Sequence, residues 1–214
     1  MISFEDAEKR VRDIKAHCGP VQGRWLFDLV RNCTPTDSFV CEIGTFYGYM
    51  TSFLGLACDE SNRRVIAIDH FIGEFCDADH EPFFYKNFID NLLHVGVWDK
   101  VVPFVAKSFD AFPFLEKSDI RFNLIYLDGD HSFDTVYKEL DLYSTLLNVG
   151  GFICGDDCGT NVVPFDDVWN GLKSSSVDLH SDVIGAVYEF FKENADFEVM
   201  QNVPASQFGF KRIK

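Results

Sequence analysis

SFVCEIGTFYGYMTSFLGLAC, residues 38–58, combines three features that together indicate the fold. Residues 38–44 have the length and apolar character of a short buried strand. Gly44 and Gly48 then punctuate the chain, and the apolar residues after them indicate a helix. Glycine at such a turn lets the backbone come close to a ligand, and the first amides of a helix can bind it. The stretch therefore predicts a strand, a tight turn and a helix, with a ligand site at the turn.

The rest of the chain continues this alternation. Strands are predicted at 63–69, 101–107, 122–128 and 150–157, helices at 4–17, 25–32, 82–95 and 134–147, and a hairpin at 197–203 and 207–213. Strands that alternate with helices indicate an α/β fold with a mainly parallel sheet and helices on both faces. No linker rich in Pro, Gly or Ser divides the chain. We expect one domain over residues 1–214, with an N-terminal helical segment at 1–32.

Composition argues against two classes of partner. The chain has 19 basic and 34 acidic residues and a net charge of -15. That charge repels phosphate backbones and anionic lipid, so we expect neither nucleic acid nor a membrane surface as a partner. The chain has no apolar signal region at its N-terminus and no run near the roughly 18 apolar residues of a membrane span. Seven scattered cysteines fit free thiols. These features predict a cytoplasmic protein.

Acidic residues end four of the predicted strands. They are Glu42, Asp69, Asp128 with Asp130, and Asp156 with Asp157. In an open α/β sheet the ligand binds beyond the carboxyl ends of the strands. A polar loop would explain one such acid, but four on the same edge favour a site there.

The first part of this site is expected to bind a nucleoside without phosphates. The glycine turn is not the GxGxxG of dinucleotide-binding proteins, and Glu42 stands just ahead of it. That carboxylate would repel a pyrophosphate and attract an ammonium or sulfonium group. Asp69 lies 27 positions after Glu42, at the end of the next strand, where an acid typically binds ribose hydroxyls.

The second part is expected to bind a metal ion. Asp128, Asp156 and Asp157 end two strands that are adjacent in such a fold, and their carboxylates would repel each other without a cation. Ligation by oxygen alone favours Mg²⁺ over zinc. A simpler interpretation is that Asp157 only caps a helix or loop and Asp128 alone has a role.

Two residues beside Asp128 are candidates for the catalytic base. A cation lowers the pKa of a bound hydroxyl, so the protein must then accept one proton. His131 suits that task near neutral pH, whereas Asp130 would add a fourth negative charge. We expect His131 to take the proton and Asp130 to orient it; a supporting polar role for His131 remains open.

The motifs VCEIGTFYGYMT, VIAIDHF, LIYLDGDHSFD and LLNVGGFICGDD resemble those of class I S-adenosylmethionine-dependent methyltransferases. The resemblance covers residues 36–160 and is greatest to the metal-dependent O-methyltransferases of catechols, caffeoyl-CoA and antibiotic sugars. It implies a Rossmann-like, seven-stranded, mostly parallel sheet with an antiparallel C-terminal strand. It also implies the same three metal ligands and a set of cofactor contacts: Glu42 and Gly44 near the methionine moiety, Gly48 in the turn, Asp69 on the ribose, Ser108 near the adenine, and Asp128 beside the cofactor. Catechol-type members often carry Lys at the position of His131, and some sugar-type members use an acid at that of Asp130.

The sequence therefore predicts an O-methyltransferase that uses S-adenosylmethionine and Mg²⁺ on a hydroxyl of a small molecule, such as a natural product, catechol or sugar. Two alternatives stay open: an NAD(P)-dependent oxidoreductase, and a non-catalytic domain that binds S-adenosylmethionine. The missing GxGxxG and Glu42 argue against the first, and the three acids argue against the second. The acceptor is not identified, and a homo-oligomer is neither predicted nor excluded.

Overall fold

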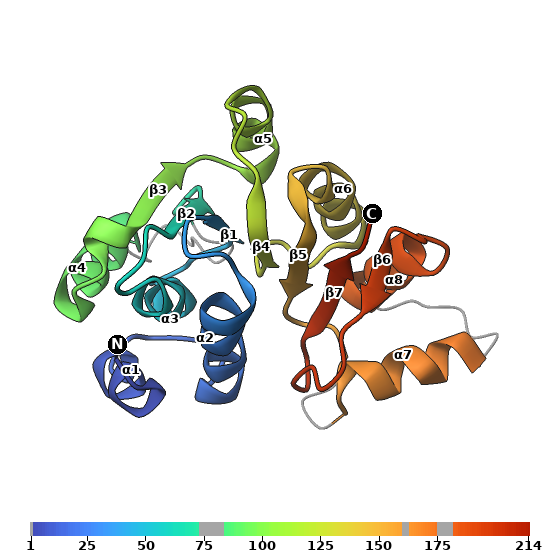
Figure 1. Cartoon of the computed structure of the whole chain (residues 1–214), viewed down its shortest axis with the longest axis horizontal. Helices are drawn as coiled ribbons and strands as arrows, with labels where there is room; N and C mark the ends of the chain where they lie inside the picture. The colour runs from blue at the N-terminus through green and yellow to red at the C-terminus, as the bar shows by residue number, and fades with distance from the viewer. Residues whose placement is uncertain (1, 73–83, 160–162, 175–181) are drawn as a thin grey trace. The chain divides into compact units, whose positions relative to one another are not determined.

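The computed structural model describes residues 2–72, 84–159, 163–174 and 182–214 (Figure 1). The strands follow the order β3-β2-β1-β4-β5-β7-β6. Their bounds are β1 Phe39–Ile43, β2 Arg64–Asp69, β3 Val101–Val105, β4 Phe122–Leu127, β5 Leu147–Gly155, β6 Phe197–Val199 and β7 Phe208–Arg212. Strands β1 to β3 pair in parallel, as do β4 and β5, whereas β7 runs antiparallel to both β5 and β6. This confirms the predicted seven-stranded, mostly parallel sheet with an antiparallel C-terminal strand.

The helices alternate with the strands, as the sequence predicted. Their bounds are α1 Phe4–Val11, α2 Pro20–Cys33, α3 Tyr49–Ala57, α4 Phe84–Val95, the 3-10 helix η1 Trp98–Lys100, α5 Ser108–Lys117, α6 Phe133–Ser144, α7 Phe165–Ser174 and α8 Asp182–Phe191. The chain divides into two compact units, Met1–Ala111 and Phe112–Lys214, with the boundary inside α5. We describe each unit by itself; the prediction of one domain over 1–214 stays a prediction.

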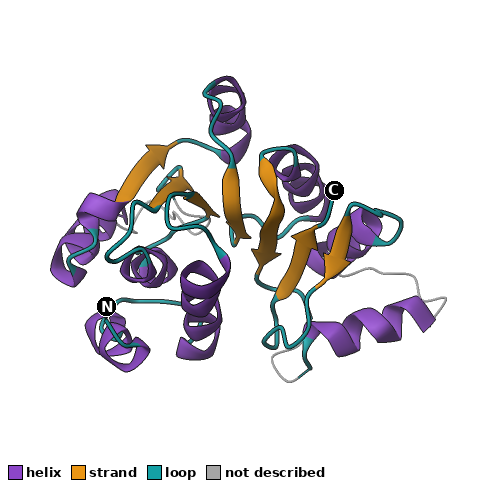
Figure 2. Ribbon diagram, viewed as in Figure 1, coloured by secondary structure: helices purple, strands orange, loops and turns teal. Residues whose placement is uncertain are grey.

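The first unit carries β1, β2 and β3 together with helices α1 to α4 (Figure 2). Helix α2 begins at Pro20, which suits the first helical turn because its missing N–H would have no partner there. Gly23 lies inside α2, where a Cβ atom would come within 2.5 Å of the Phe53 ring. The sequence took both residues as breakers and began this helix at residue 25. That prediction was wrong, because close packing of α2 on α3 requires a glycine inside the helix.

The second unit carries β4, β5, β7 and β6 with helices α6 to α8. The Phe210 ring of β7 is stacked on Phe191 of α8, with ring centroids 3.5 Å apart, and packs edge-on against Trp169 of α7. For residues 161–172 the sequence allowed either a helix packed on the sheet or a lining of the acceptor site, and it gave no prediction for α8. Both helices bury one face, α7 through Phe165 and Trp169 and α8 through Val183, Val187 and Phe191.

Two boundaries in the second unit differ from the prediction. Helix α6 ends at Ser144 rather than at residue 147, and β5 begins at Leu147 rather than at residue 150. Leu147 fits the helical period of α6, but it pairs with Phe122 of β4 in the sheet. The backbone pairing decides its conformation. Helix α5 was also missed, because Pro113 in its interior obscures the helical pattern.

Within the described residues, no helix is long and apolar enough to cross a membrane.

Candidate functional site

The glycine turn of the first unit has a backbone with positive φ angles at both of its glycines. Gly44 and Gly48 have φ angles of 83° and 84°, which only glycine adopts without cost. Gly48 is also the N-cap of α3, and a Cβ atom there would lie 3.0 Å from the Phe88 ring. The turn between β1 and α3 therefore needs both glycines, independently of any ligand.

Asp69, at the end of β2, holds this turn in place. Its Oδ2 atom accepts hydrogen bonds from the backbone N–H groups of Thr45 at 2.8 Å and Phe46 at 3.0 Å. Its Oδ1 atom accepts one from Phe71 N–H at 2.7 Å. The Thr45 hydroxyl also lies 3.5 Å from Oδ2. A carboxylate oxygen has two lone-pair directions, so Oδ1 keeps one that a single ribose hydroxyl could use. Asp69 thus links β2 to the turn, a role that the sequence did not predict.

Glu42 is buried in the same unit, with 1% of its surface exposed. The Thr51 hydroxyl donates a hydrogen bond of 2.5 Å to its Oε2 atom. Burial raises the pKa of Glu42 to about 8; the Thr51 hydrogen bonds oppose this shift, and the nearby charge of Asp69 adds to it. The carboxyl group is therefore mainly protonated at neutral pH. The sequence argument treated it as charged, because burial cannot be seen in a motif.

This burial predicts that Glu42→Gln stabilises the protein at alkaline pH. The folded state keeps the Glu42 proton up to about pH 8, whereas an unfolded chain releases it near pH 4.5. Stability therefore falls as pH rises between these values, and a glutamine avoids the loss. We expect the variant to gain about 1–3 kcal/mol in unfolding free energy at pH 8.5 and little at pH 4. Urea unfolding at both pH values measures this, with exposed Glu116→Gln as control. An equal gain at both values would contradict it.

Ser108, the predicted adenine contact, is the first residue of α5. It lies in the first unit, three positions after the carboxyl end of β3. The first unit thus contains five predicted cofactor residues: Glu42, Gly44, Gly48, Asp69 and Ser108. The sixth, Asp128, lies in the second unit together with the predicted metal ligands.

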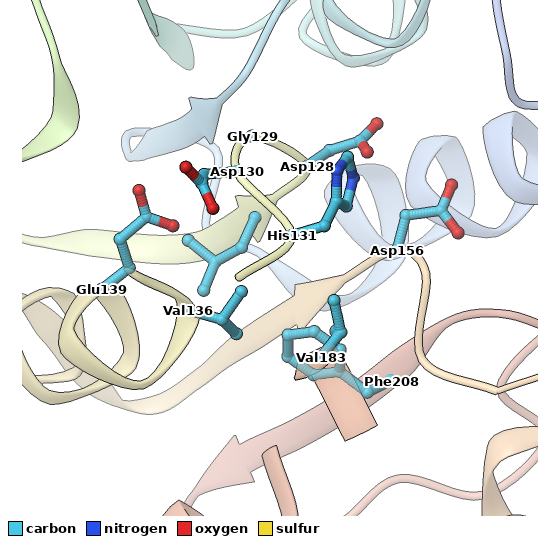
Figure 3. Close-up of a pocket in the computed structure, with 10 residues that line it drawn as sticks. Asp128, Gly129, Asp130, His131, Val136, Glu139, Asp156, Val183 and Phe208 are labelled. Carbon is cyan, nitrogen blue, oxygen red and sulfur yellow. The ribbon is translucent and has the colours of Figure 1, made fainter. Parts of the chain in front are cut away.

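The acids of the second unit meet because β4 and β5 pair side by side. Leu127 pairs with Gly155, which places Asp128 and Asp156 next to each other at the strand ends. One oxygen atom of each lies within 4.8 Å of the other. Asp128 also forms a cluster with His131 and Asp157, whose ligand atoms all lie within 4.8 Å of one another. Figure 3 shows the side chains of Asp128, His131 and Asp156 gathered at the same part of the pocket.

His131 and Asp157 form a close pair. Nε2 of His131 lies 2.6 Å from Oδ2 of Asp157, and both side chains are about half exposed. Asp157 has a φ of 57°, uncommon for a residue other than glycine, and its N–H donates to Oδ1 of Asp156 at 2.8 Å. This backbone conformation directs the Asp157 side chain toward the His131 imidazole. A carboxylate beside a histidine orients the ring and favours its protonated form.

Asp130 is separated from this cluster. In Figure 3 it lies on the other side of the loop from Asp128 and His131. Its Oδ1 atom accepts a hydrogen bond of 2.7 Å from Ser132 N–H. Partial burial opposes ionisation of Asp130, but the hydrogen bonds from Ser132 outweigh it and keep the pKa below its usual value. Asp130 therefore stabilises the start of α6 and is a weak base.

Asp156 is partly buried. Burial raises its pKa to about 6; the Asp157 N–H opposes the shift, the Asp157 charge adds to it, and His131 opposes it. A cation beside the carboxylate would remove this penalty. Asp128 lies within 4.8 Å of Asp156 in one group and of His131 and Asp157 in another. Their oxygen atoms suit a hard divalent cation such as Mg²⁺, and the predicted metal stays a prediction.

Comparison with known proteins identifies the family. Residues 41–158, more than half of the chain, match the family model described as a methyltransferase domain. The chain belongs to this methyltransferase family. The matched segment runs from β1 to just beyond Asp157 and so includes every predicted site residue.

One curated relative of this methyltransferase is uncharacterized protein R132 of Acanthamoeba polyphaga mimivirus. The two are 28% identical over 134 residues, which is 62% of this chain and 57% of the relative. The chain thus spans little more than half the length of that relative.

Solved structures share the fold at low identity. An O-methyltransferase from Bacillus cereus in complex with SAH matches with a TM-score of 0.67 and 19% identity, over 99% of this chain and 90% of that one. TomG from Streptomyces achromogenes, an O-methyltransferase of tomaymycin synthesis in complex with SAM, matches with a TM-score of 0.66 and 19% identity, over 99% and 89%. A putative caffeoyl-CoA O-methyltransferase from Staphylococcus aureus matches with a TM-score of 0.64 and 13% identity, over 100% and 93%.

Sequence reasoning missed Glu139, which lines the pocket around Asp128 and His131 in this methyltransferase. The pocket also has apolar walls from Leu127, Val136, Val183 and Phe208. Glu139 is 3% exposed although it is an acid. A signal was present, because Glu139 lies three positions after Val136, on the apolar face of α6.

Proposed function

We propose that this methyltransferase transfers a methyl group from S-adenosylmethionine to a hydroxyl of a small molecule, with Mg²⁺ held at the acidic cluster. The observation that carries the proposal is the meeting of Asp128, His131 and Asp157 at the strand ends of the second unit. Such a cluster provides both oxygen ligands and a base. The names of the structural neighbours support an oxygen acceptor, since they include O-methyltransferases.

Asp128, Asp156 and Asp157 would hold the cation. The ion supplies positive charge that makes an acceptor hydroxyl more acidic. Asp156 is fixed by the Asp157 N–H, and Asp157 is fixed by its own backbone turn and by His131. These contacts limit the movement of the ligands, and a rigid ligand set loses less entropy on binding.

His131 would accept the acceptor proton. If its Nε2–H donates to Asp157, the other ring nitrogen, Nδ1, carries the lone pair that takes the proton. The negative charge of Asp157 then stabilises the imidazolium that results. S-adenosylmethionine would supply a methyl group on a positively charged sulfur, which the acceptor oxygen can take with a neutral thioether as the leaving group. Asp130 accepts the hydrogen bond from Ser132 N–H before α6 and so stabilises the loop.

The proposed use of S-adenosylmethionine is tested by measuring its binding to the full chain. We expect S-adenosylmethionine to bind and NADH not to bind in isothermal titration calorimetry. Asp69→Asn keeps the side-chain volume but removes the charge that ribose hydroxyls and the turn amides use. Its affinity for S-adenosylmethionine should fall roughly 10- to 150-fold, the range for hydrogen bonds to a charged group.

The matched control is Asp99→Asn, which changes an acid of η1 at the opposite, amino end of β3. Its affinity should equal that of the wild type. Unchanged affinity in Asp69→Asn would remove Asp69 from the cofactor site. Binding of NADH in place of S-adenosylmethionine would instead favour an oxidoreductase.

A further inference from the structure

Gln207 is a buried polar side chain that neither the fold nor the proposed reaction accounts for. It lies directly before β7 and has no exposed surface. Within the described part of the chain, neither its Nε2 nor its Oε1 atom has a hydrogen-bond partner. An unpaired buried polar group costs about 1–3 kcal/mol, and native structures contain few of them. The carboxamide of Gln207 can therefore bond a polar group that comes within reach.

The sheet register places Gln207 opposite Asp156. Strands β5 and β7 are antiparallel, and Gly155 pairs with Phe208. Asp156 directly follows β5 and Gln207 directly precedes β7, so extending this register by one step brings Asp156 opposite Gln207. Opposite residues of an antiparallel pair point to the same face, with Cβ atoms roughly 4.5–5.5 Å apart. The carboxamide therefore lies on the same side of the sheet as the Asp156 carboxylate.

The backbone around Gln207 is fixed at several points. Cys158 N–H donates to Ser206 O at 2.8 Å, and Gln207 N–H donates to Pro204 O at 3.1 Å. A bridge between Pro164 and Ala205 ties the same segment to the start of α7. These bonds join the residues that follow Asp156 to those that precede Phe208. Gln207 is thus held on rigid backbone, as a residue that orients a ligand must be.

The Gln207 carboxamide is a potential hydrogen-bond donor to the Asp156 carboxylate. The Gln207 side chain interacts with the Asp156 carboxylate, although no hydrogen bond within 3.5 Å joins them. A small movement of either side chain would form one.

We infer that Gln207 is a positioning residue: its Nε2–H₂ group donates to Asp156 when that carboxylate holds a divalent cation. This inference rests on the proposed metal site and adds a residue that the sequence motifs do not contain. Groups that hydrogen-bond a metal ligand fix its orientation, and their loss commonly weakens metal binding about 10- to 100-fold.

The test is Mn²⁺ binding to the full chain without cofactor or acceptor, measured from the electron paramagnetic resonance signal of unbound Mn²⁺. Gln207→Met keeps the length of the side chain and removes its polar atoms. We expect about 10- to 100-fold weaker Mn²⁺ binding. Stability to urea should be unchanged or higher, because an unpaired amide is removed. Gln207→Asn, which withdraws the amide by one methylene, should also weaken binding and serves if the methionine variant does not fold.

The matched control is Trp169→Phe, which removes another buried and unpaired donor of the second unit, the indole Nε1. Its Mn²⁺ affinity should equal that of the wild type. Wild-type affinity in the folded Gln207 variants would overturn the inference, and lower stability with unchanged affinity would assign Gln207 a structural role. If the wild type itself binds no Mn²⁺, the proposed metal site fails and this inference fails with it. Wild-type binding with unaffected variants refutes only the role of Gln207.

Discussion

Removal of divalent cations with EDTA is expected to lower methyl transfer by roughly 10²- to 10⁴-fold, and added Mg²⁺ is expected to restore it. The physical reason is the close approach of three carboxylates, of which Asp128 lies within 4.8 Å of Asp156 and also of Asp157. Positive charge at this point stabilises the oxyanion of the acceptor by several kcal/mol, which corresponds to a rate factor of that size.

Asp128→Asn should reproduce the effect of EDTA in the presence of Mg²⁺, because it removes a charged ligand without changing the side-chain volume. The measurement is transfer of labelled methyl from S-adenosylmethionine to the hydroxyl compound that the wild type methylates fastest in a panel of catechols and sugars. Asp141→Asn, an exposed acid of α6, is the control and should retain full activity. Undiminished transfer in EDTA would refute the cation requirement and leave a mechanism based on His131 alone.

His131→Ala is expected to lower kcat by roughly 10²- to 10⁴-fold, the usual contribution of a positioned base. The imidazole contacts Asp157 at 2.6 Å and belongs to the cluster around Asp128, so it lies where a proton would be released. Affinity for S-adenosylmethionine should change little, because His131 is not among the predicted nucleoside contacts. His94→Ala, a surface histidine of α4, serves as control.

The pH–rate profile distinguishes His131 from Asp130. The wild-type rate should fall at low pH as the base becomes protonated, and this fall should disappear in His131→Ala. Asp130→Asn should keep it, since the Asp130 carboxylate is engaged with Ser132 and has a lowered pKa. The opposite result, a fall that survives in His131→Ala and vanishes in Asp130→Asn, would exchange the two roles.

The sequence by itself determined the succession of strands along the chain, most of the helices between them and the placement of acids at the strand ends. Residues 38–58 predicted β1, the turn and α3, because hydrophobic period and glycine act locally. In the structure Asp69 ends β2, Asp128 follows β4 and Asp156 follows β5, so each lies at the carboxyl end of a parallel strand, as predicted. Local pattern also predicted the antiparallel C-terminal hairpin.

Only the tertiary structure decided how these groups are paired and charged. Asp69 binds the amides of Thr45 and Phe46, and His131 binds Asp157; each pair joins segments that are distant in sequence. The protonation of Glu42 follows from desolvation, which depends on the whole shell of atoms around it. Gln207 stands opposite Asp156 because β7 folds back antiparallel onto β5. Chain periodicity records which face of an element is apolar, but partner, register and burial arise only when elements pack together.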